Sequence, residues 1–339
     1  MKQKKPLNPF VLIFAVVVVA WLFTFIITPG TLVDGVYTAL PKNAFNFNNV
    51  FNLFRAVPMG IKDTSNLVIL VLVIGGALEI YKSTGAIDSS ITKMVHKFGS
   101  GSRTFLLIAL MVLFSVIGGF LGWIETLIPF APLVVAMILA LGYDGIVACA
   151  VLIIGLMGGF VTGPTNLYTV GVCNGILQNM GLLSADSDVF VGLGFRAVLW
   201  AIMTIIGVAV VYANRIAKDP AKSLVHGVDV SDLVLDTSKD VTVTGRHVAV
   251  LLSILAAMIM TVIGMQKGFG GVKWGIDDVS AVFLASALFS GIVGKLHPSE
   301  IANSFVKGAG GAVGGALVIG FARGVYWVMN SANINATIV

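Results

Sequence analysis

Two long apolar stretches, each interrupted by a short polar island, constrain what this chain can fold into more than any other feature. The first island is Gly-Trp-Ile-Glu-Thr at 122–126, and the second is Val-Thr-Gly-Pro-Thr-Asn at 161–166. A helix broken at membrane depth leaves N–H and C=O groups that hydrocarbon cannot satisfy. Such breaks persist only where protein buries them or water reaches them, and secondary transporters build substrate sites from paired broken helices.

The composition places these stretches in a membrane. Hydrophobic residues make up 57% of the 339 residues, charged residues make up 11%, and the mean hydropathy is +0.99. Several apolar runs approach the ~20 residues that cross a bilayer. The first run, 10–27, is too long for a secretory signal peptide, and no small-residue cleavage site follows it. The pI of about 9.2 reflects basic loops between spans, which indicate membrane orientation and not nucleic-acid binding.

The chain is therefore predicted to be an all-α polytopic membrane protein. With the N-terminus in the cytoplasm, fourteen of the 21 lysines and arginines fall in cytoplasmic loops and five in outer loops, in line with the positive-inside rule. This distribution requires a re-entrant hairpin that enters and leaves from the cytoplasm, with 122–126 as its tip. The predicted spans are 10–28, 66–81, the hairpin 104–122 with 127–141, a broken span 145–180, 190–213, 247–265, 279–294 and 309–328.

The sequence contains an internal repeat. Leu72–Ala77 is Leu-Val-Ile-Gly-Gly-Ala and Leu317–Ala322 is Leu-Val-Ile-Gly-Phe-Ala, and Tyr81 matches Tyr326 in the same register. The order of the spans gives the two copies opposite directions across the membrane. Similar sequence in opposite orientation is the signature of an inverted-topology repeat.

The repeat divides the chain into three parts. We expect a first repeat at 1–213, which includes the hairpin and the broken span, a cytoplasmic linker at 214–246, and the start of a second repeat at 247–339. The second copy of the repeat, 247–339, contains no counterpart of the hairpin or of the broken span. We therefore expect a truncated carrier in which half of the substrate site is missing.

Glu125 is the sharpest candidate for a binding residue. A carboxylate in a membrane segment costs roughly 3 kcal/mol on insertion scales and needs a partner or a function. Thr126 begins the second hairpin arm, where a helix N-terminus offers free N–H groups to an anion. The alternative is an interfacial glutamate on an ordinary outer loop, but the distribution of basic residues favours the hairpin tip.

The second island supplies the other candidate residues. Gly163 and the following proline break the helix, and Thr162, Thr165 and Asn166 supply hydroxyl and amide groups for a polar ligand or a cation. The alternative is a plain Gly-Pro turn between two spans. The segments on either side are each too short to cross a bilayer alone, which favours a single broken span.

Other features suggest structural roles. Glu79 and Arg323 lie at nearby positions of the two repeat copies, and we expect structural ion pairs there. The glycine-rich run 308–315 suggests either close helix packing in the membrane or a flexible hinge. The sequence contains no nucleotide-binding loop, zinc-ligand spacing or nucleophile elbow. We therefore expect neither an enzyme nor a resident cofactor or metal.

Five stretches resemble the C4-dicarboxylate anaerobic carrier-like family, specifically its YfcC branch, in the family's order. They are Phe25–Gly30, Ile74–Ala77 with Thr84–Asp88, Pro129–Pro132 with Leu141–Asp144, Asn166–Gly171, and Thr244–His247. The resemblance implies the ion-transporter superfamily fold, with two inverted repeats that each carry a re-entrant hairpin. It also implies a bacterial inner-membrane carrier. Family hairpin tips carry two adjacent acids followed by threonine; Glu125 matches the first acid, and Thr126 replaces the second.

The functional prediction is a multi-pass secondary transporter of a small polar metabolite. The resemblance implies a carboxylate such as a C4-dicarboxylate, and its YfcC branch implies a basic amino acid exchanger as the alternative. A structural membrane protein without transport activity is the alternative of another class. Coupling to Na⁺ or H⁺ and the formation of a homo-oligomer stay open at this stage. The expected partners are the small-molecule substrate and the lipid bilayer.

Overall fold

The computed structural model confirms an all-α polytopic architecture. It describes residues 8–33, 36–98, 103–122, 124, 131–166, 169–170, 172–179, 182–184, 191–213, 242–266, 268–269, 271–272 and 274–338. Seven helices in this part of the chain are long and apolar enough to cross a membrane. A short antiparallel hairpin, β1 (Gly30–Val33) with β2 (Val36–Ala39), adds a small amount of strand that the all-α prediction did not include.

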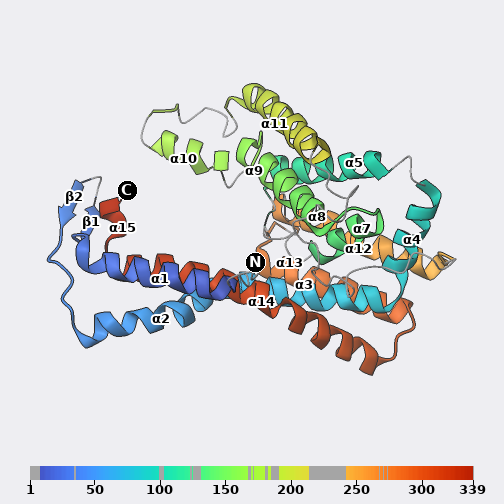
Figure 1. Ribbon diagram of the computed structural model, residues 1–339, viewed down its shortest axis with the longest axis horizontal. Coiled ribbons are helices and arrows are strands. Elements are labelled where there is room, and N and C mark those ends of the chain that lie inside the picture. Colours follow the sequence, from blue (N-terminus) through green and yellow to red (C-terminus); the bar gives the residue numbers. More distant parts are fainter. Residues whose placement is uncertain are drawn as a thin grey trace, which may run out of the picture.

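The helices form two layers that lie one above the other in Figure 1. The lower layer consists of α1 (Pro9–Ile26), α2 (Phe47–Asp63), α3 (Ser65–Ser83), α12 (Gly245–Gln266), α13 (Ile276–Val293) and α14 (Pro298–Ser331). The upper layer consists of α5 (Arg103–Val116), η2 (Ile117–Leu121), α7 (Ala131–Ala140), α8 (Gly145–Leu152), η4 (Ile153–Met157), α9 (Gly158–Thr162), α10 (Val172–Asn179) and α11 (Leu193–Ala213). The helix α4 (Ala86–Phe98) joins them, and α15 (Asn335–Ile338) follows α14.

The two copies of the repeated sequence lie on helices that run antiparallel. Ser83 at the end of α3 contacts Ser304 near the start of α14, with the two hydroxyl oxygens 2.9 Å apart. Farther back along α3, Gly75 packs so closely on α14 that a Cβ there would lie 2.9 Å from the carbonyl oxygen of Gly308. At the other end of α14, a Cβ at Gly60 of α2 would lie 2.2 Å from the carbonyl oxygen of Gly320. The two sequence copies therefore run in opposite directions, and the inverted-topology repeat stays a prediction.

The neighbours of these two helices repeat the relationship. The helix α1 runs parallel to the C-terminal half of α14, where the rings of Phe10 and Phe321 are 5.3 Å apart (Figure 1). The helix α13 runs parallel to α3, and a Cβ at Gly294 would lie 2.6 Å from the Thr84 methyl group. Each of the two helices therefore has one parallel neighbour, which is α13 for α3 and α1 for α14. The helix α3 thus packs against α13 and α14, and α14 packs against α1 and α3.

The helix α14 is longer than predicted. It covers 34 residues from Pro298 to Ser331, whereas the hydropathy pattern predicted 309–328. Its polar first turns are helical because proline occupies an initial position and Glu300 forms a capping box, with its Oε2 accepting from the His297 N–H at 2.8 Å. At ~1.5 Å per residue this helix is about 51 Å long, which exceeds the ~30 Å hydrocarbon core.

Hydroxyl groups join three helices within the lower layer. Tyr81 on α3 is fully buried, and its hydroxyl donates to Ser286 Oγ on α13 at 3.0 Å. Ser286 in turn donates to the carbonyl oxygen of Ser253 on α12 at 3.0 Å, and Ser253 lies 2.6 Å from Ser290 between the hydroxyl oxygens. Hydrogen bonds of this kind hold helices together where the surrounding solvent is hydrocarbon.

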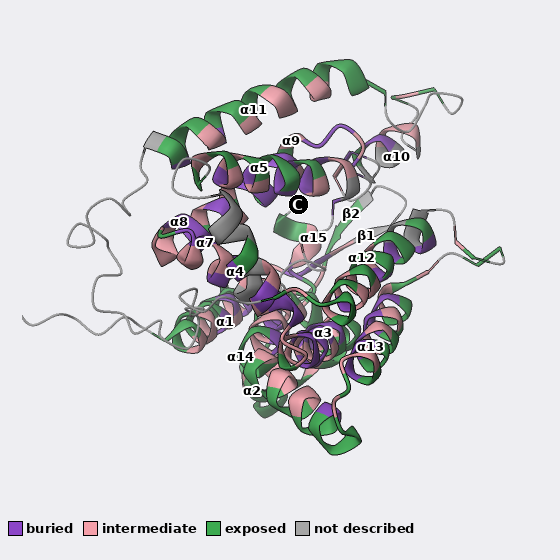
Figure 2. Ribbon diagram, turned by 90° about the vertical axis from the view of Figure 1, so that its right-hand side faces the viewer, coloured by how far each residue is buried: buried purple, intermediate pink, exposed green. Residues whose placement is uncertain are grey.

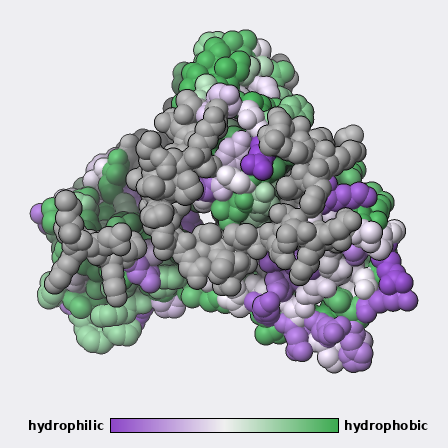
Figure 3. Space-filling view, turned by 45° about the vertical axis from the view of Figure 1, so that its right-hand side comes forward, coloured by the Kyte–Doolittle hydropathy of each residue, from purple (hydrophilic) through white to green (hydrophobic). Residues whose placement is uncertain are grey.

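The exterior of the molecule is apolar where lipid is expected. Figure 2 shows α11 lying over α5, with its outward side exposed. Figure 3 shows hydrophobic surface gathered at the top of the molecule, where α11 lies, and polar surface at the lower right. Exposed large apolar side chains on α11 include Phe195, Ile202, Ile205 and Ile206. A contiguous apolar exterior of this kind fits a helix that faces the bilayer.

Candidate functional site: two adjoining helix breaks

The first predicted break lies at the end of α5 and η2, the segment that the sequence predicts as the first arm of a hairpin. The helix α5 widens into the π-helix η2, which ends at Gly122 with φ of +72°, a left-handed conformation that favours glycine. The Gly122 N–H donates to the carbonyl oxygens of Ile117 and Gly118, both at 3.1 Å. The structure therefore confirms a break at Gly122, whereas Glu125 and Thr126 lie outside the described residues.

The second predicted break is also confirmed. The helix α8 passes through the π-helix η4 into α9, which ends at Thr162, and Gly163–Asn166 leave the helical path. Thr162 Oγ1 donates back to the Gly158 carbonyl oxygen at 2.8 Å. Asn166 is fully buried, and its Nδ2 donates to the Phe160 carbonyl oxygen at 3.2 Å, which satisfies a helix-end acceptor.

The two breaks contact each other, although about 40 residues separate them in the sequence. Thr165 Oγ1 donates to the Phe120 carbonyl oxygen at 3.0 Å. A Cβ at Gly163 would lie 2.5 Å from the Gly119 carbonyl oxygen, so the two backbones approach as closely as only glycine permits. Both breaks are preceded by a π-helix, a geometry that is found frequently at functional sites.

Glycines hold the two approaching segments together along their length. A Cβ at Gly118 would lie 2.1 Å from the Leu156 carbonyl oxygen, and a Cβ at Gly159 would lie 2.2 Å from the Ser115 carbonyl oxygen. Small residues allow helix backbones to approach closely in membranes. The sequence therefore fixes the position of the second break relative to the first through backbone contact and not through flexible side chains.

The helix α11 completes the site with residues that the sequence analysis missed. Trp200 Nε1 donates to the Ser115 carbonyl oxygen at 3.1 Å, and its ring meets Phe120 edge-on at 5.2 Å. Ser115 and Thr204 place their hydroxyl oxygens 2.6 Å apart. The missed signal was the i, i+4 spacing of Trp200 and Thr204, two side chains that can form hydrogen bonds within a largely apolar span.

Two side chains near the breaks have buried polar atoms without a hydrogen-bond partner among the described residues. They are Thr169 Oγ1, three residues beyond Asn166, and Arg196 Nε, one turn before Trp200. Buried polar atoms in native proteins are nearly always paired with protein, water or a ligand. Within the part of the chain that the structure describes, these two atoms have no hydrogen-bond partner.

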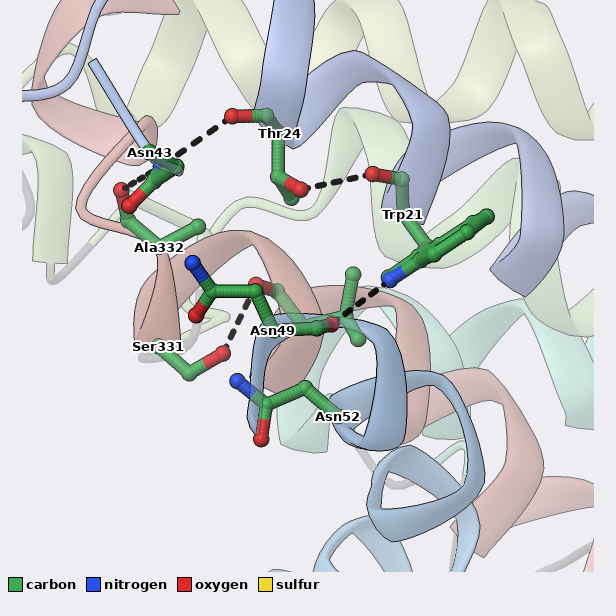
Figure 4. A pocket seen from close by; sticks show the side chains of 8 residues that line it. Trp21, Thr24, Asn43, Asn49, Asn52, Ser331 and Ala332 are labelled. Carbon is green, nitrogen blue, oxygen red and sulfur yellow. Dashed lines mark hydrogen bonds between the residues drawn. The ribbon is translucent and has the colours of Figure 1, made fainter. Parts of the chain in front are cut away.

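A second polar cluster lies far from these breaks, where α1, α2 and the end of α14 meet (Figure 4). Asn43 Nδ2 donates to the carbonyl oxygens of Thr24 at 3.1 Å and Ala332 at 3.0 Å, and Trp21 Nε1 donates to the Asn49 carbonyl oxygen at 2.8 Å. The cavity has a volume of about 10 Å³, which is the space of one water molecule. It ties three segments together and is too small for a metabolite.

The chemistry of the site is that of hydroxyl, amide and carbonyl groups. Within the described ranges, no group of three or more His, Cys, Asp or Glu side chains could hold a metal ion.

The glycine run 308–315 on α14 differs from the close packing that its sequence suggested. Gly308 packs on α3, but Cβ atoms at Gly310, Gly311, Gly314 and Gly315 would meet no described atom within 4 Å. Close packing therefore uses only the first glycine of the run.

Comparison with known proteins identifies the family. The family model of the C4-dicarboxylate anaerobic carriers matches residues 8–339. The chain belongs to this carrier family. It is 31% identical over 269 residues to the protein named "Putative basic amino acid antiporter YfcC" of Escherichia coli (strain K12), with 76% of this chain and 50% of that protein covered.

A second relative is an "Uncharacterized protein" of Haemophilus influenzae. It is 24% identical over 296 residues, with 85% of this chain and 55% of that protein covered. The chain thus spans about half the length of the curated relatives it matches. Among solved structures, the YdaH transporter of Alcanivorax borkumensis aligns with a TM-score of 0.44 and 13% identity, over 96% of this chain and 71% of that one.

Proposed function

We propose that this member of the carrier family is a secondary transporter whose substrate binds where the two helix breaks meet. The observation that carries the proposal is the contact between the breaks, in which Thr165 Oγ1 donates to the Phe120 carbonyl oxygen at 3.0 Å. Paired broken helices free backbone N–H and C=O groups for a polar ligand at membrane depth. A carrier needs such a polar site enclosed by apolar spans.

The proposed binding residues come from both breaks. From the second break they are Thr162, Gly163, Thr165 and Asn166, and from the hairpin tip, on the sequence argument alone, Glu125 and Thr126. The hydroxyl and amide groups orient a polar metabolite, whereas the Glu125 carboxylate binds a cationic group of the substrate or a coupling cation. Alternating access follows when the part that carries the breaks moves against the α3–α14 layer.

Two substrate classes have specific support. The family's description favours a small carboxylate such as a C4-dicarboxylate. The relative at 31% identity is named as a basic amino acid antiporter, and a single carboxylate at Glu125, with threonine at 126, suits a cationic amine better than a dianion. We keep the dicarboxylate as the first candidate and the basic amino acid as the second.

A binding experiment tests the proposal and separates the two classes. The melting temperature of the purified chain in detergent is measured against rising succinate or L-arginine, since a ligand at 100 times its Kd stabilises the native state by about 2.7 kcal/mol. We expect a saturable rise with one of them and its loss in Glu125→Gln. Glu300→Gln, which changes a glutamate at the start of α14, serves as the matched control.

Uptake then separates binding from transport. Uptake is measured into proteoliposomes that contain the chain and that either carry an imposed Na⁺ or H⁺ gradient or are loaded with unlabelled solute. The condition that drives accumulation shows whether transport is coupled to an ion or to exchange. A folded wild-type chain that shows neither a melting shift nor uptake with either solute would contradict the proposed function.

A further inference from the structure

The helix α14 contributes to two separate hydrophobic clusters. Its first part adds Ile301 and Phe305 to a cluster that also contains apolar side chains of α3, α12 and α13. Its last part adds Val328 to a smaller cluster with Val17 of α1 and Ala56 of α2. No described side chain of α14 between these two parts, from 306 to 324, belongs to either cluster.

The two clusters divide the lower layer into two units. We call α3, α12 and α13 with the first part of α14 the α3 unit, and α1 and α2 with the last part of α14 the α1 unit. Figure 1 shows the α1 unit at the left and the α3 unit at the right. The connections between them run along α14 and through the junction of α2 with α3.

The middle of α14 is open on one side. A Cβ would meet no described atom within 4 Å at any of four exposed glycines, which are Gly310, Gly311, Gly314 and Gly315. Other glycines of the same helix differ. A Cβ at Gly308 would lie 2.2 Å from the Gly75 carbonyl oxygen, and one at Gly324 would lie 2.8 Å from the Ala56 carbonyl oxygen. Packing between described residues therefore requires glycine at 308 and 324 but not at the four open positions.

The four open glycines weaken the helix where they stand. Glycine is the least favourable residue after proline in a helix interior, because its backbone loses the most freedom there. Sharp helix bends occur at proline, at glycine and at interruptions of the hydrogen-bond ladder. Ala312, within the run, faces Gly75 of α3, since a Cβ at Gly75 would lie 2.6 Å from the Ala312 methyl group. The helix can therefore bend towards its open side.

The second connection between the units is interrupted at the same level. Thr64 separates α2 from α3, and its φ of −115° and ψ of 22° depart from helical geometry. One turn earlier, Gly60 packs on Gly320 of α14. Because α2 and α14 are antiparallel, Thr64 lies about one turn before Gly320 along α14, next to Gly315. Both connections between the units are therefore weakest side by side.

We propose that the glycine run 310–315 and Thr64 form a hinge about which the α1 unit moves against the α3 unit. Domain hinges consist of a few residues that absorb the change in backbone angles between rigid parts. Each unit has its own apolar cluster and keeps it during the movement. The inference goes beyond the proposed substrate site and does not depend on it, because it concerns a movement of the chain itself.

The test measures the bending of α14 directly. Spin labels are attached to cysteines introduced at the exposed Asn303 and Asn330, in the full chain with Cys149 and Cys173 replaced by serine, and distances are measured by double electron–electron resonance in nanodiscs. A straight helix places these positions about 40 Å apart. We expect a broad distribution that extends to shorter distances. Replacing the four open glycines by alanine should leave one peak near the straight-helix distance and narrow the distribution at least twofold.

A matched control removes open glycines elsewhere in the chain. A Cβ at Gly158 or Gly194 would also meet no described atom within 4 Å, and neither residue lies on α14. Gly158→Ala with Gly194→Ala should leave the distribution unchanged. A single narrow distance in the otherwise wild-type chain would overturn the proposal. An unchanged broad distribution in the four-alanine variant would also overturn it, and would fit glycines that receive another helix.

Hydrogen exchange covers the case in which the labels disturb the fold. In the unlabelled chain, opening of the hinge exposes the amides of 314–319, which follow the open glycines along α14. We expect these amides to exchange at least tenfold faster than those of 325–329, and the four-alanine variant to remove this difference. Equal exchange in the two segments of the wild-type chain would overturn the proposal.

Discussion

Lys307 on α14 donates to Glu79 on α3, with 2.6 Å between Nζ and Oε1, and a second, longer ion pair lies farther along α14. There Arg323 on α14 approaches Asp63 at the end of α2. Glu79 and Arg323 occupy nearby positions of the two sequence copies, so the repeat exchanges the sign of the charge. The first copy supplies both acids, and the second supplies both cations.

Because one copy carries the acids and the other carries the cations, each copy is complementary in charge to the other copy and not to a second copy of itself. Pairing of α3 with another α3, or of α14 with another α14, would bring like charges together, which disfavours the wrong partner. We expect Glu79→Lys to lower the melting temperature and the double variant Glu79→Lys with Lys307→Glu to recover most of the loss. Because Lys307 is largely exposed, the change will be small and will fall at high salt. An additive loss in the double variant would contradict the pairing.

The membrane orientation gives a second prediction. Ser83 and Ser304 meet at one end of the lower layer, whereas the Tyr37 and Thr337 hydroxyl oxygens lie 3.0 Å apart at the other end. With the N-terminus in the cytoplasm, single cysteines at Ser83 and Ser304 should react only with reagents on the cytoplasmic side. Cysteines at Tyr37 and Thr337 should react from outside.

The labelling uses a background in which Cys149 and Cys173, both free and exposed, are replaced by serine. An impermeant maleimide is applied to intact cells and to inverted vesicles, and the labelled fraction is compared. Cysteines at Ser83 and Thr337 that react from the same side would contradict the predicted topology.

The sequence predicted local breaks well and long-range partners poorly. Glycine and proline at 163–164 and glycine at 122 end their helices through backbone geometry, which is a local property and therefore visible in the sequence. The contact between Thr165 and Phe120 depends on how two distant segments pack, which periodicity does not report. The repeat predicted that α3 and α14 are related by inversion, because similar sequence implies similar local structure.

Two further differences have simple physical causes. The polar first turns of α14 escaped a hydropathy-based prediction because capping, and not burial, makes them helical. The sequence analysis did not assign Trp200 and Arg196 on α11 to the site, because one polar residue per turn hardly changes the hydropathy of an apolar span. The ion pairs of Glu79 and Arg323 were expected, but their partners, Lys307 and Asp63, depend on the tertiary arrangement.

Asp88 gives a third prediction, on pH dependence. It lies in the first turn of α4, and its Oδ1 is buried with no hydrogen-bond partner among the described residues. Burial raises the pKa of this carboxyl above its ordinary value of 3.8; Lys82 opposes the rise, and Glu79 adds to it. The folded chain therefore holds this proton to higher pH than the unfolded chain does.

The sign of the effect follows from linkage. Between 3.8 and the raised pKa of the folded state, the native chain binds more protons, so its stability falls as the pH rises through this window. Asp88→Asn removes this loss, and we expect it to raise the melting temperature at neutral pH but not below pH 3.8. Melting curves across pH test this, and an equal effect of the substitution at all pH values would show that Asp88 does not titrate in this way.

The adjacent glycines Gly158 and Gly159 give the last prediction, because they differ sharply in surroundings. A Cβ at Gly159 would lie 2.2 Å from the Ser115 carbonyl oxygen, whereas a Cβ at Gly158 would meet no described atom within 4 Å. Gly159→Ala must therefore push α9 away from α5, at a cost of about 1–3 kcal/mol in the free energy of unfolding. Gly158→Ala should be neutral or stabilise the helix by up to about 1 kcal/mol.

The functional consequence of the same pair follows from the contact between the breaks. Displacing α9 lengthens the bond from Thr165 Oγ1 to the Phe120 carbonyl oxygen and opens the proposed site. Gly159→Ala should therefore reduce the ligand-induced rise in melting temperature by more than its effect on basal stability, and Gly158→Ala should preserve it. Equal ligand responses in the two variants, with Gly159→Ala clearly destabilised, would show that the contact between the breaks supports the fold and not the binding site.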